Sequence, residues 1–477
     1  MRQSPLITRR TLITGSLAFA VFGRGSSVLC DAMRVLAAAS PLVTVDVRSF
    51  GARGDNQADD TAAVQQAIEY VYRRGGGVVR FSPGIYLVGS VNIYPGIAYV
   101  GERAVIRRPD IRSAFAPPTG ARTFTTQPVR YSGLADSPPL IVKNLTFDGN
   151  VDNQGSKKET EQAHLLFLSA RTATPGRLKA IVEDCVFRNS PADGITVYTN
   201  VDGVIMNCAA HNCRRTGLTM NGGYSRVQVS HFRCTRGTYA PRIDMEIASP
   251  GYGGTQAVDV VMDDVYCEGN FELEVNGGEV LASNLRLAGS RFSLVGRGIG
   301  TARFVNCDIG VGGRGRVHSP GRVTFEGCRF RGRRDEANAP PESGIALNIL
   351  WNPGGRRIEN QVVRVADCDF VVDPDTEPGG EKLTAISTNK DQLSFGNRLV
   401  VEGGSISADY DVGLRMERGG RWVIKETVIQ SPLPLRLRSS IGFPMDVLLD
   451  GAVIEGRPTL LAFKGEGKSV DYPPKKN

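Results

Sequence analysis

The sequence predicts an all-β solenoid, and three observations lead to that prediction. A short motif recurs along most of the chain, each copy alternates apolar and other residues, and helical spacing of apolar residues occurs at one place only. A short strand of this kind buries its apolar side only by stacking on a neighbouring copy. A leucine-rich repeat is the alternative, but its Leu-x-x-Leu-x-Leu consensus is absent.

The motif reads apolar, any residue, Asn/Asp/Gly, apolar or small, any residue, apolar, as in Val142–Phe147. Most copies are 20–25 residues apart. Asn and Asp tolerate left-handed backbone and bond their own main chain, so the central position is expected to be a turn between two strands. The predicted turn centres are Asn144, Asp184, Asn207, His231, Asp264, Asn284, Asn306, Gly327, Asp367, Gly403, Glu426 and Gly451.

Cysteines occur at the position after the turn centre in several copies, as in Cys185, Cys208, Cys307 and Cys368. There they are expected to be small buried residues stacked along the core. Disulfides are the alternative, since eight cysteines follow residue 39. No CxxC pair is present, so a zinc site has little support.

The N-terminus has the pattern of an export signal. The pair Arg9-Arg10 precedes the moderately apolar stretch 12–22, which indicates twin-arginine export, with an ordinary Sec signal as the alternative. We therefore expect a signal at 1–39, one solenoid domain at 40–465 and a polar tail at 466–477. The expected location is periplasmic or secreted, with the twin-arginine export machinery as a partner. No later apolar run is long enough to span a bilayer.

The charge balance excludes a nucleic-acid partner. The full chain has a net charge of +8, from 57 basic and 49 acidic residues. Residues 1–39 hold five arginines and one aspartate, so the remainder has 52 basic and 48 acidic residues, or +4. That excess is too small to predict nucleic-acid binding.

Residues 45–93 read as a cap for the exposed end of the solenoid. A helix is expected at 60–73, capped by Asp59 or Asp60, with Ala63, Val64, Ala67, Ile68 and Val71 on its apolar face. The runs Phe50–Asp55, Gly75–Val79 and Pro83–Tyr86 resemble the N-terminal signature of the pectate-lyase superfamily. This resemblance implies a right-handed single-stranded parallel β-helix and a tendency to act on polysaccharides. It does not by itself imply one activity.

Five strands from successive coils align by their inward apolar positions. They begin at Ile195, Leu218, Ile243, Phe271 and Phe292, and their second and fourth residues are expected to point outward. The third and fourth of these strands place four carboxylates together on one exposed face. The predicted catalytic residues are Asp244, Glu246, Glu272 and Glu274.

Clustered carboxylates repel unless they bind a cation or have separated pKa values. The spacing suits the acid and base of a glycoside hydrolase. It also suits Ca²⁺, which would assist a lyase by neutralising a uronate carboxylate while an arginine takes the proton. A solvated charged face with arginine partners is the structural alternative.

Five further residues are predicted to contact the substrate. Tyr198 and Asn221 extend the outward columns, Arg215 and Arg242 precede the aligned strands, and His211 lies in a preceding turn. The Gly-His-Gly of polygalacturonases and the Asp-Pro-His-Asp of mannuronan epimerases are both absent.

The sequence therefore predicts an exported polysaccharide-degrading enzyme. The favoured activity is a glycoside hydrolase acting on a pectin-like or other acidic polysaccharide, without a cofactor. The alternatives are a Ca²⁺-dependent lyase or uronan epimerase, and a non-catalytic glycan-binding protein.

Overall fold

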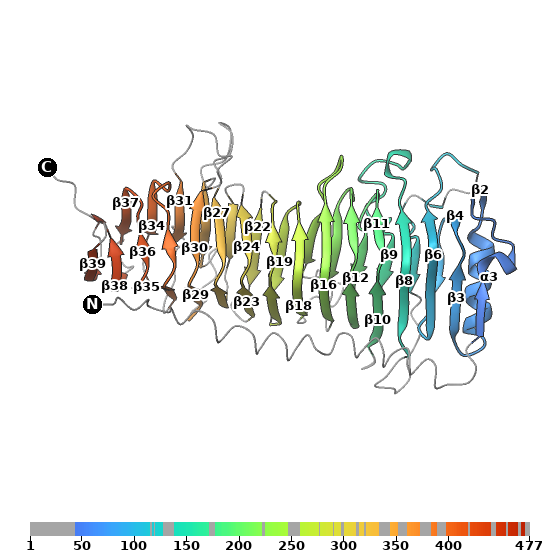
Figure 1. The fold of residues 1–477 in the computed structure, drawn as a ribbon, viewed down its shortest axis with the longest axis horizontal. Coiled ribbons are helices and arrows are strands. Elements are labelled where there is room, and N and C mark those ends of the chain that lie inside the picture. The colour runs from blue at the N-terminus through green and yellow to red at the C-terminus, as the bar shows by residue number, and fades with distance from the viewer. Residues whose placement is uncertain are drawn as a thin grey trace, which may run out of the picture.

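In the computed structural model the chain forms a right-handed parallel β-helix, as the sequence predicts. Its coils stack from the helix α3 (Thr61–Tyr72) at one end to strands β38 (Met445–Ile454) and β39 (Arg457–Gly465) at the other (Figure 1). The described strands form two sheets, of 26 strands (sheet A) and 14 strands (sheet B). Within both sheets almost every pairing is parallel, because each strand meets its counterpart one coil later.

The structure describes residues 43–472 apart from the following positions: 115–116, 119, 127–137, 171–176, 222–224, 247–257, 276, 290, 297–299, 312–313, 319–320, 333–343, 352–359, 373–382, 389–396, 418–419, 440–444, 455–456 and 466–468. The predicted export signal lies outside the described residues.

One coil shows how the chain turns. Strand β10 (Leu178–Glu183) ends at a left-handed residue, β11 (Val186–Arg188) ends at a second one, and β12 (Ile195–Val197) crosses to sheet B. Two sharp bends and one longer connection thus close this coil. The in-register pairs of the next coil repeat this path, so side chains of equivalent positions stack in columns.

The predicted turn centres are confirmed. All twelve adopt positive φ angles, from 48° at Asp264 to 67° at Gly451. Such angles are uncommon for residues other than Gly, and Asn and Asp reach them most easily. This conformational demand explains why the motif keeps Asn, Asp or Gly at its centre.

The cap follows the predicted helix with one difference in its N-terminal contacts. Val64, Ala67, Ile68 and Val71 are buried against the first coils. Asp60 occupies the capping position, but its carboxylate accepts hydrogen bonds from the backbone N–H groups of Arg53 and Gly54. The side chain of Asp59 instead accepts the bond from the N–H of Thr61, at 3.0 Å. Among the residues that the structure describes, no helix is both long and apolar enough to cross a membrane.

The opposite end closes with strands of reversed direction. β39 pairs antiparallel with β38, and β40 (Ser469–Tyr472) pairs antiparallel with β37 (Leu433–Arg438). Reversal ends the coil stacking, since the next parallel partner is absent at that edge of the described chain. β40 lies within the segment 466–477 that the sequence analysis treats as a polar tail.

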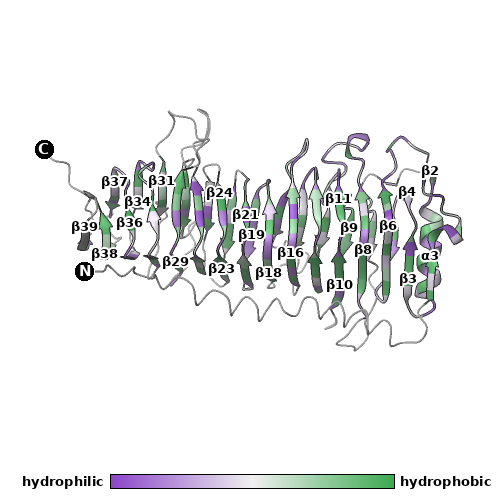
Figure 2. Cartoon of the chain, in the orientation of Figure 1, coloured by the Kyte–Doolittle hydropathy of each residue, from purple (hydrophilic) through white to green (hydrophobic). Residues whose placement is uncertain are grey.

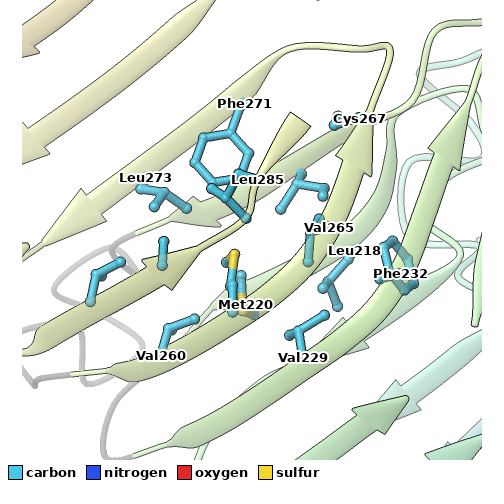
Figure 3. Close-up of a cluster of buried hydrophobic side chains, with 14 of the residues drawn as sticks. Leu218, Met220, Val229, Phe232, Val260, Val265, Cys267, Phe271, Leu273 and Leu285 are labelled. Atoms are coloured by element: carbon cyan, nitrogen blue, oxygen red, sulfur yellow. The ribbon is translucent and has the colours of Figure 1, made fainter. Parts of the chain in front are cut away.

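One cluster of buried apolar side chains fills the interior of the β-helix along its described length. Figure 3 shows part of it at the middle coils, where Leu218, Phe232, Val265 and Phe271 belong to one buried cluster. Along the strands apolar and polar residues alternate (Figure 2), as expected when one side faces this core. The eight described cysteines are free and buried, so the predicted structural role of these thiols is confirmed.

Candidate active site on the outer face of sheet B

The outer face of sheet B carries a continuous column of mostly polar residues. The register joins Phe167, Thr196, Thr219, Asp244, Glu272 and Ser293 in adjacent strands. The strands concerned are β9 (Leu166–Leu168), β12, β15 (Thr216–Asn221), β17 (Arg242–Glu246), β19 (Phe271–Val275) and β22 (Phe292–Gly296). The neighbours of these residues along each strand lie in the core, so the register predicted for the five aligned strands is confirmed.

A buried carboxylate forms the first part of the site. Asp193 is fully buried just before β12, and its Oδ2 lies 3.1 Å from Nδ1 of His164. Arg215 donates two hydrogen bonds to the carboxylate, from Nε to Oδ1 and from Nη2 to Oδ2, each 2.7 Å long. The hydroxyls of Thr196 and Thr219 donate to Oδ2 at 3.1 Å. The carboxylate is therefore held from several sides in one orientation.

The surroundings of Asp193 decide its ionisation. Burial alone would raise the pKa of this carboxyl, but His164 and then Arg215 outweigh burial and hold the pKa well below its usual range. Asp193 therefore stays ionised across the physiological pH range. Its contact with Nδ1 of His164 is a close approach of 3.1 Å and not a hydrogen bond of that atom.

The loop that carries His164 is fixed by the arginine next to Arg215. Arg214 donates from Nη1 to the carbonyl of Gly155 at 2.7 Å and to Oγ1 of Thr160 at 3.1 Å. Its Nη2 donates to the carbonyl of Val151 at 3.1 Å. One guanidinium thus spans the loop between Val151 and His164, while the adjacent guanidinium holds Asp193.

The far side of His164 leads toward the surface. Its Nε2 lies 3.3 Å from Oε1 of Gln162, whose side chain is exposed. The imidazole stacks on the ring of Phe167 at a centroid distance of 5.8 Å. The guanidinium of Arg122 lies 3.6 Å from the centroid of the same ring. Nε2 is therefore the atom of this ring that a bound molecule would reach by displacing Gln162.

The predicted acidic patch forms the second part of the site. Asp244 lies one coil beyond Thr219, and Glu272 lies next to Asp244 in register on the following coil. Nε of Arg242 lies 3.2 Å from Oδ2 of Asp244, and Nη1 of Arg242 lies 3.5 Å from Oε2 of Glu272. Nη1 of Arg291 lies 3.5 Å from Oε1 of Glu272. Both carboxylates are thus ion-paired with guanidinium groups.

The expectation that all four carboxylates are exposed is wrong for Asp244. The side chain of Asp244 is only 5% exposed and that of Glu272 is 21% exposed. Glu274 points outward beside them and is partly exposed. Glu246 lies at the end of β17, and its side chain is outside the described set. The sequence pattern gives the direction of a side chain but not the burial that neighbouring arginines cause.

The patch does not suit Ca²⁺ in the arrangement described. Ca²⁺ needs six to eight oxygen ligands, whereas Asp244 and Glu272 already contact guanidinium groups. Over the described side chains, no three or more His, Cys, Asp or Glu residues are grouped to hold a metal ion. We therefore derive no step through a metal.

The predicted substrate contacts are divided between the two sheets. Tyr198 follows β12 and is half-buried, with its ring 5.6 Å from that of Phe167. Asn221 ends β15 opposite Glu246. His211 is exposed in β14 (Ala209–His211) of sheet A, where its Nδ1 lies 3.0 Å from Oγ1 of Thr235. His211 is therefore on a different sheet from the rest of the site.

Sequence reasoning missed the pair formed by His164 and Asp193. Nothing local to either residue indicates their contact, because the loop before β9 brings His164 to the following coil. One signal was present: Asp193 and Arg215 both lie two to three residues before an aligned strand. Oppositely charged residues at equivalent places in adjacent coils are expected to pair.

Comparison with known proteins finds a family model that matches the N-terminal part of the described coils. Residues 44–239 match the family model described as "Rhamnogalacturonase A/epimerase, pectate lyase-like". That range contains His164, Asp193 and Arg215, and it ends before the acidic patch. The chain is 32% identical over 207 residues to mannuronan C5-epimerase AlgE4 of Azotobacter vinelandii, which covers 37% of this chain and 36% of that protein.

Two further relatives are from the same organism. Alginate lyase 7 is 32% identical over 207 residues, which covers 37% of this chain and 23% of the lyase. Mannuronan C5-epimerase AlgE3 is 26% identical over 206 residues, which covers 37% of this chain and 11% of the epimerase. The chain thus spans well under half of the length of these curated relatives.

Solved structures show the same fold. The A-module of mannuronan C-5 epimerase AlgE4 aligns with 79% of this chain and 98% of its own, at a TM-score of 0.52 and 16% identity. The N-terminal fragment of gene product 12 from bacteriophage Phi29 aligns with 92% of this chain and 76% of its own, at a TM-score of 0.51 and 14% identity. The chain is therefore a right-handed parallel β-helix whose residues 44–239 match a pectate-lyase-like family model.

Proposed function

We propose that the chain acts on a uronate polysaccharide such as mannuronan, as an epimerase or a lyase, at the outer face of sheet B. The observation that carries the proposal is the contact between His164 and Asp193. It lies inside the region that matches the family model, and mannuronan epimerases and an alginate lyase are among the relatives. Polysaccharide-acting chemistry is the part that all of these relatives share.

Both activities begin with the same step, removal of the proton at C5 of a uronate. That proton is next to the sugar carboxylate, so a cation on the carboxylate makes its removal easier. Arg215 and Arg242 lie along the outer face and would bind the carboxylate. The C5–H electron pair would then stay on C5 and the adjacent carboxylate.

His164 is our candidate for the base. Its Nε2 would accept the C5 proton, while the Asp193 carboxylate lies 3.1 Å from Nδ1 on the other side of the ring. In an epimerase, a proton from the opposite face of the ring would then complete inversion at C5. In a lyase, the electron pair would form the C4–C5 double bond and expel the oxygen at C4. The half-buried Tyr198 hydroxyl is our candidate for the proton donor in either case.

Hydrolysis is less well supported than either reaction. The relatives that match this chain in sequence are named as mannuronan epimerases and an alginate lyase, and these names give the other two reactions. The predicted Ca²⁺ dependence stays a prediction, as does export through the twin-arginine route.

The test is incubation of polymannuronate with the purified chain in D₂O, with and without EDTA. Proton NMR would follow deuterium at C5 and the appearance of guluronate, and absorbance would follow unsaturated ends. Inversion with deuterium uptake is expected for an epimerase, and unsaturated ends for a lyase. New reducing ends without either signal would overturn the proposal. His164→Gln should abolish both C5 exchange and the formation of unsaturated ends. Loss of wild-type activity when EDTA is added would establish a metal requirement.

A further inference from the structure

Four consecutive strands of sheet B carry buried polar atoms that have no hydrogen-bond partner among the described residues. These strands are β19, β22, β25 (Arg314–His318) and β28 (Ile345–Leu350). In β22 the residue concerned, Arg291, directly precedes the strand. Such atoms are rare in native proteins because an unmade hydrogen bond costs free energy. The atoms are Glu272 Oε1, Arg291 Nε, His318 Nε2 and Asn348 Oδ1. Glu272 and Arg291 pair with each other as ions, at 3.5 Å between Oε1 and Nη1, but this contact is not a hydrogen bond of these two atoms.

All four side chains lie on the outer face of the sheet. The register joins Glu272, Ser293, Arg316 and Asn348 in one column of adjacent strands. Residues beside them along the strands, such as Leu273, Leu294, Val317 and Ile349, belong to the core. His318 lies two residues after Arg316 and therefore on the same face. These polar groups thus lie on one surface, beyond the region that matches the family model.

Asn348 supplies the deepest of these atoms. Asn348 is only 3% exposed, yet its Oδ1 has no hydrogen-bond partner among the described residues. The pairing between β25 and β28 shifts by one residue between Ile345 and Asn348. Such bulges redirect side chains and are frequent next to binding sites. The chain therefore departs from its regular repeat at the place where a buried acceptor is left without a partner.

The chemistry of the group suits an acidic sugar. Arg291 and Arg316 provide positive charge for a carboxylate. Burial, followed by the nearby charges of Arg316 and Arg291, lowers the pKa of His318 to about 4. The ring is therefore neutral at neutral pH and offers one donor and one acceptor. The Asn348 carbonyl and the Glu272 carboxylate would accept hydrogen bonds from sugar hydroxyls.

We propose that the outer face of β19, β22, β25 and β28 is a second saccharide-binding subsite, which holds a uronate unit of the polymer away from His164 and Asp193. This inference rests on the proposed function, since it assigns a further subsite to the same substrate. From β12 to β22 the sheet advances four strands, or about 19 Å. One 1,4-linked pyranose lengthens a polymer by nearly the distance between neighbouring strands. The His164 site and the proposed subsite are therefore about four sugars apart.

The test measures the affinity of the full chain for mannuronate oligomers of different length. Asn348→Ala and His318→Ala each remove one group of the subsite. Each should weaken binding of an octamer by about tenfold, the worth of one good hydrogen bond. Binding of a trimer at the His164 end should not change. Arg303→Gln is the matched control, because Arg303 pairs with Glu326 at the exposed surface of sheet A.

Stability measurements separate binding from folding. Since Asn348 Oδ1 has no hydrogen-bond partner within the described part of the chain, Asn348→Ala should melt close to the wild-type temperature while the octamer affinity falls. Unchanged octamer affinity in both variants, or an equal loss for trimer and octamer, would overturn the subsite. Length-dependent binding that these variants weaken, in a wild-type chain without turnover, would support the subsite and overturn the proposed function alone.

Discussion

The imidazole Nδ1 of His164 lies 3.1 Å from the carboxylate Oδ2 of Asp193, and both side chains are removed from solvent. The two residues come from successive coils, so their contact depends on the stacking of the β-helix. Arg215 completes the arrangement with two hydrogen bonds to the same carboxylate. Burying a carboxylate between an imidazole and a guanidinium costs folding free energy, because each group loses its hydration. This cost is expected where a group must be held ready for chemistry.

Asp193→Asn should therefore destabilise the chain in a pH-dependent way. The substitution removes the buried counter-charge of the half-buried Arg215, at a cost of about 3 kcal/mol at neutral pH, the lower end of the range for a broken buried pair. The folded pKa of Asp193 lies below the unfolded value of about 3.9. As the pH falls below about 4 the unfolded chain takes up the proton first, so the wild-type advantage shrinks.

Chemical denaturation followed by circular dichroism, at a series of pH values, would measure this difference. Asp202→Asn is the control, because Asp202 pairs with Arg177 near the surface at 2.8 Å, where a pair is worth at most about 1 kcal/mol. A wild-type advantage that stays constant between neutral pH and about pH 3 would contradict the depressed pKa.

Arg214→Lys should displace the loop that carries His164. Lysine keeps the charge but cannot span the three acceptors that the guanidinium reaches in this loop. We expect kcat to fall by a factor on the order of ten to one hundred with little change in KM, as for a displaced catalytic group. Activity on polymannuronate measures the rate.

Imidazole NMR signals provide the readout that a purely structural role would not move. The chain has four histidines, so the ring signals can be assigned by substitution. In Arg214→Lys the His164 signals should shift, while those of His318 stay in place. Arg177→Lys is the control variant and should leave all four unchanged. Unmoved His164 signals together with lost activity would show that Arg214 acts in another way.

The fold could be predicted from the sequence because its rules are local. A left-handed turn needs Asn, Asp or Gly, and a strand buried on one side needs alternation, so both leave a periodic pattern. The same pattern gave the register of β12, β15, β17, β19 and β22. The C-terminal closure by β39 and β40 was missed, because strand reversal has no motif of its own.

The site could be predicted only in part. Alternation indicated that Asp244 and Glu272 face outward, but it could not show that Arg242 reaches both carboxylates. Long arginine side chains choose partners in neighbouring coils, and no spacing rule fixes that choice. His164 was also undervalued, since a loop conformation rather than a strand brings it to Asp193.

The turn conformation makes a stability prediction at Asn306, whose φ is 53°. Asn306→Ala should lower the free energy of unfolding by about 1 kcal/mol, because an alanine resists the left-handed region. Asn306→Gly should cost little, since glycine occupies the equivalent turn at Gly327 with φ of 60°. Thermal melting of both variants is the measurement. Equal destabilisation by Ala and Gly would instead indicate that the Asn306 side chain, not its backbone, supports the turn.

The stacked thiols predict that the chain must fold before it meets an oxidant. Cys185 lies in register with Cys208, and Cys234 with Cys267. Each is buried and free. Burial raises the pKa of Cys213 to about 12, which suppresses the reactive thiolate in the folded protein. In the unfolded chain the same thiols are accessible and close in sequence.

A thiol-reactive dye should therefore label none of the eight described cysteines in the native protein, and all of them after denaturation. Cys30→Ser removes the ninth cysteine of the sequence and simplifies the count. Refolding should succeed with a reductant and fail with an oxidant, because random disulfides block coil stacking. Export of a Sec-signal fusion into an oxidising periplasm should give misfolded protein, with recovery in a strain that lacks the disulfide-forming oxidase. Full refolding under oxidising conditions would remove this reason for expecting export in the folded state.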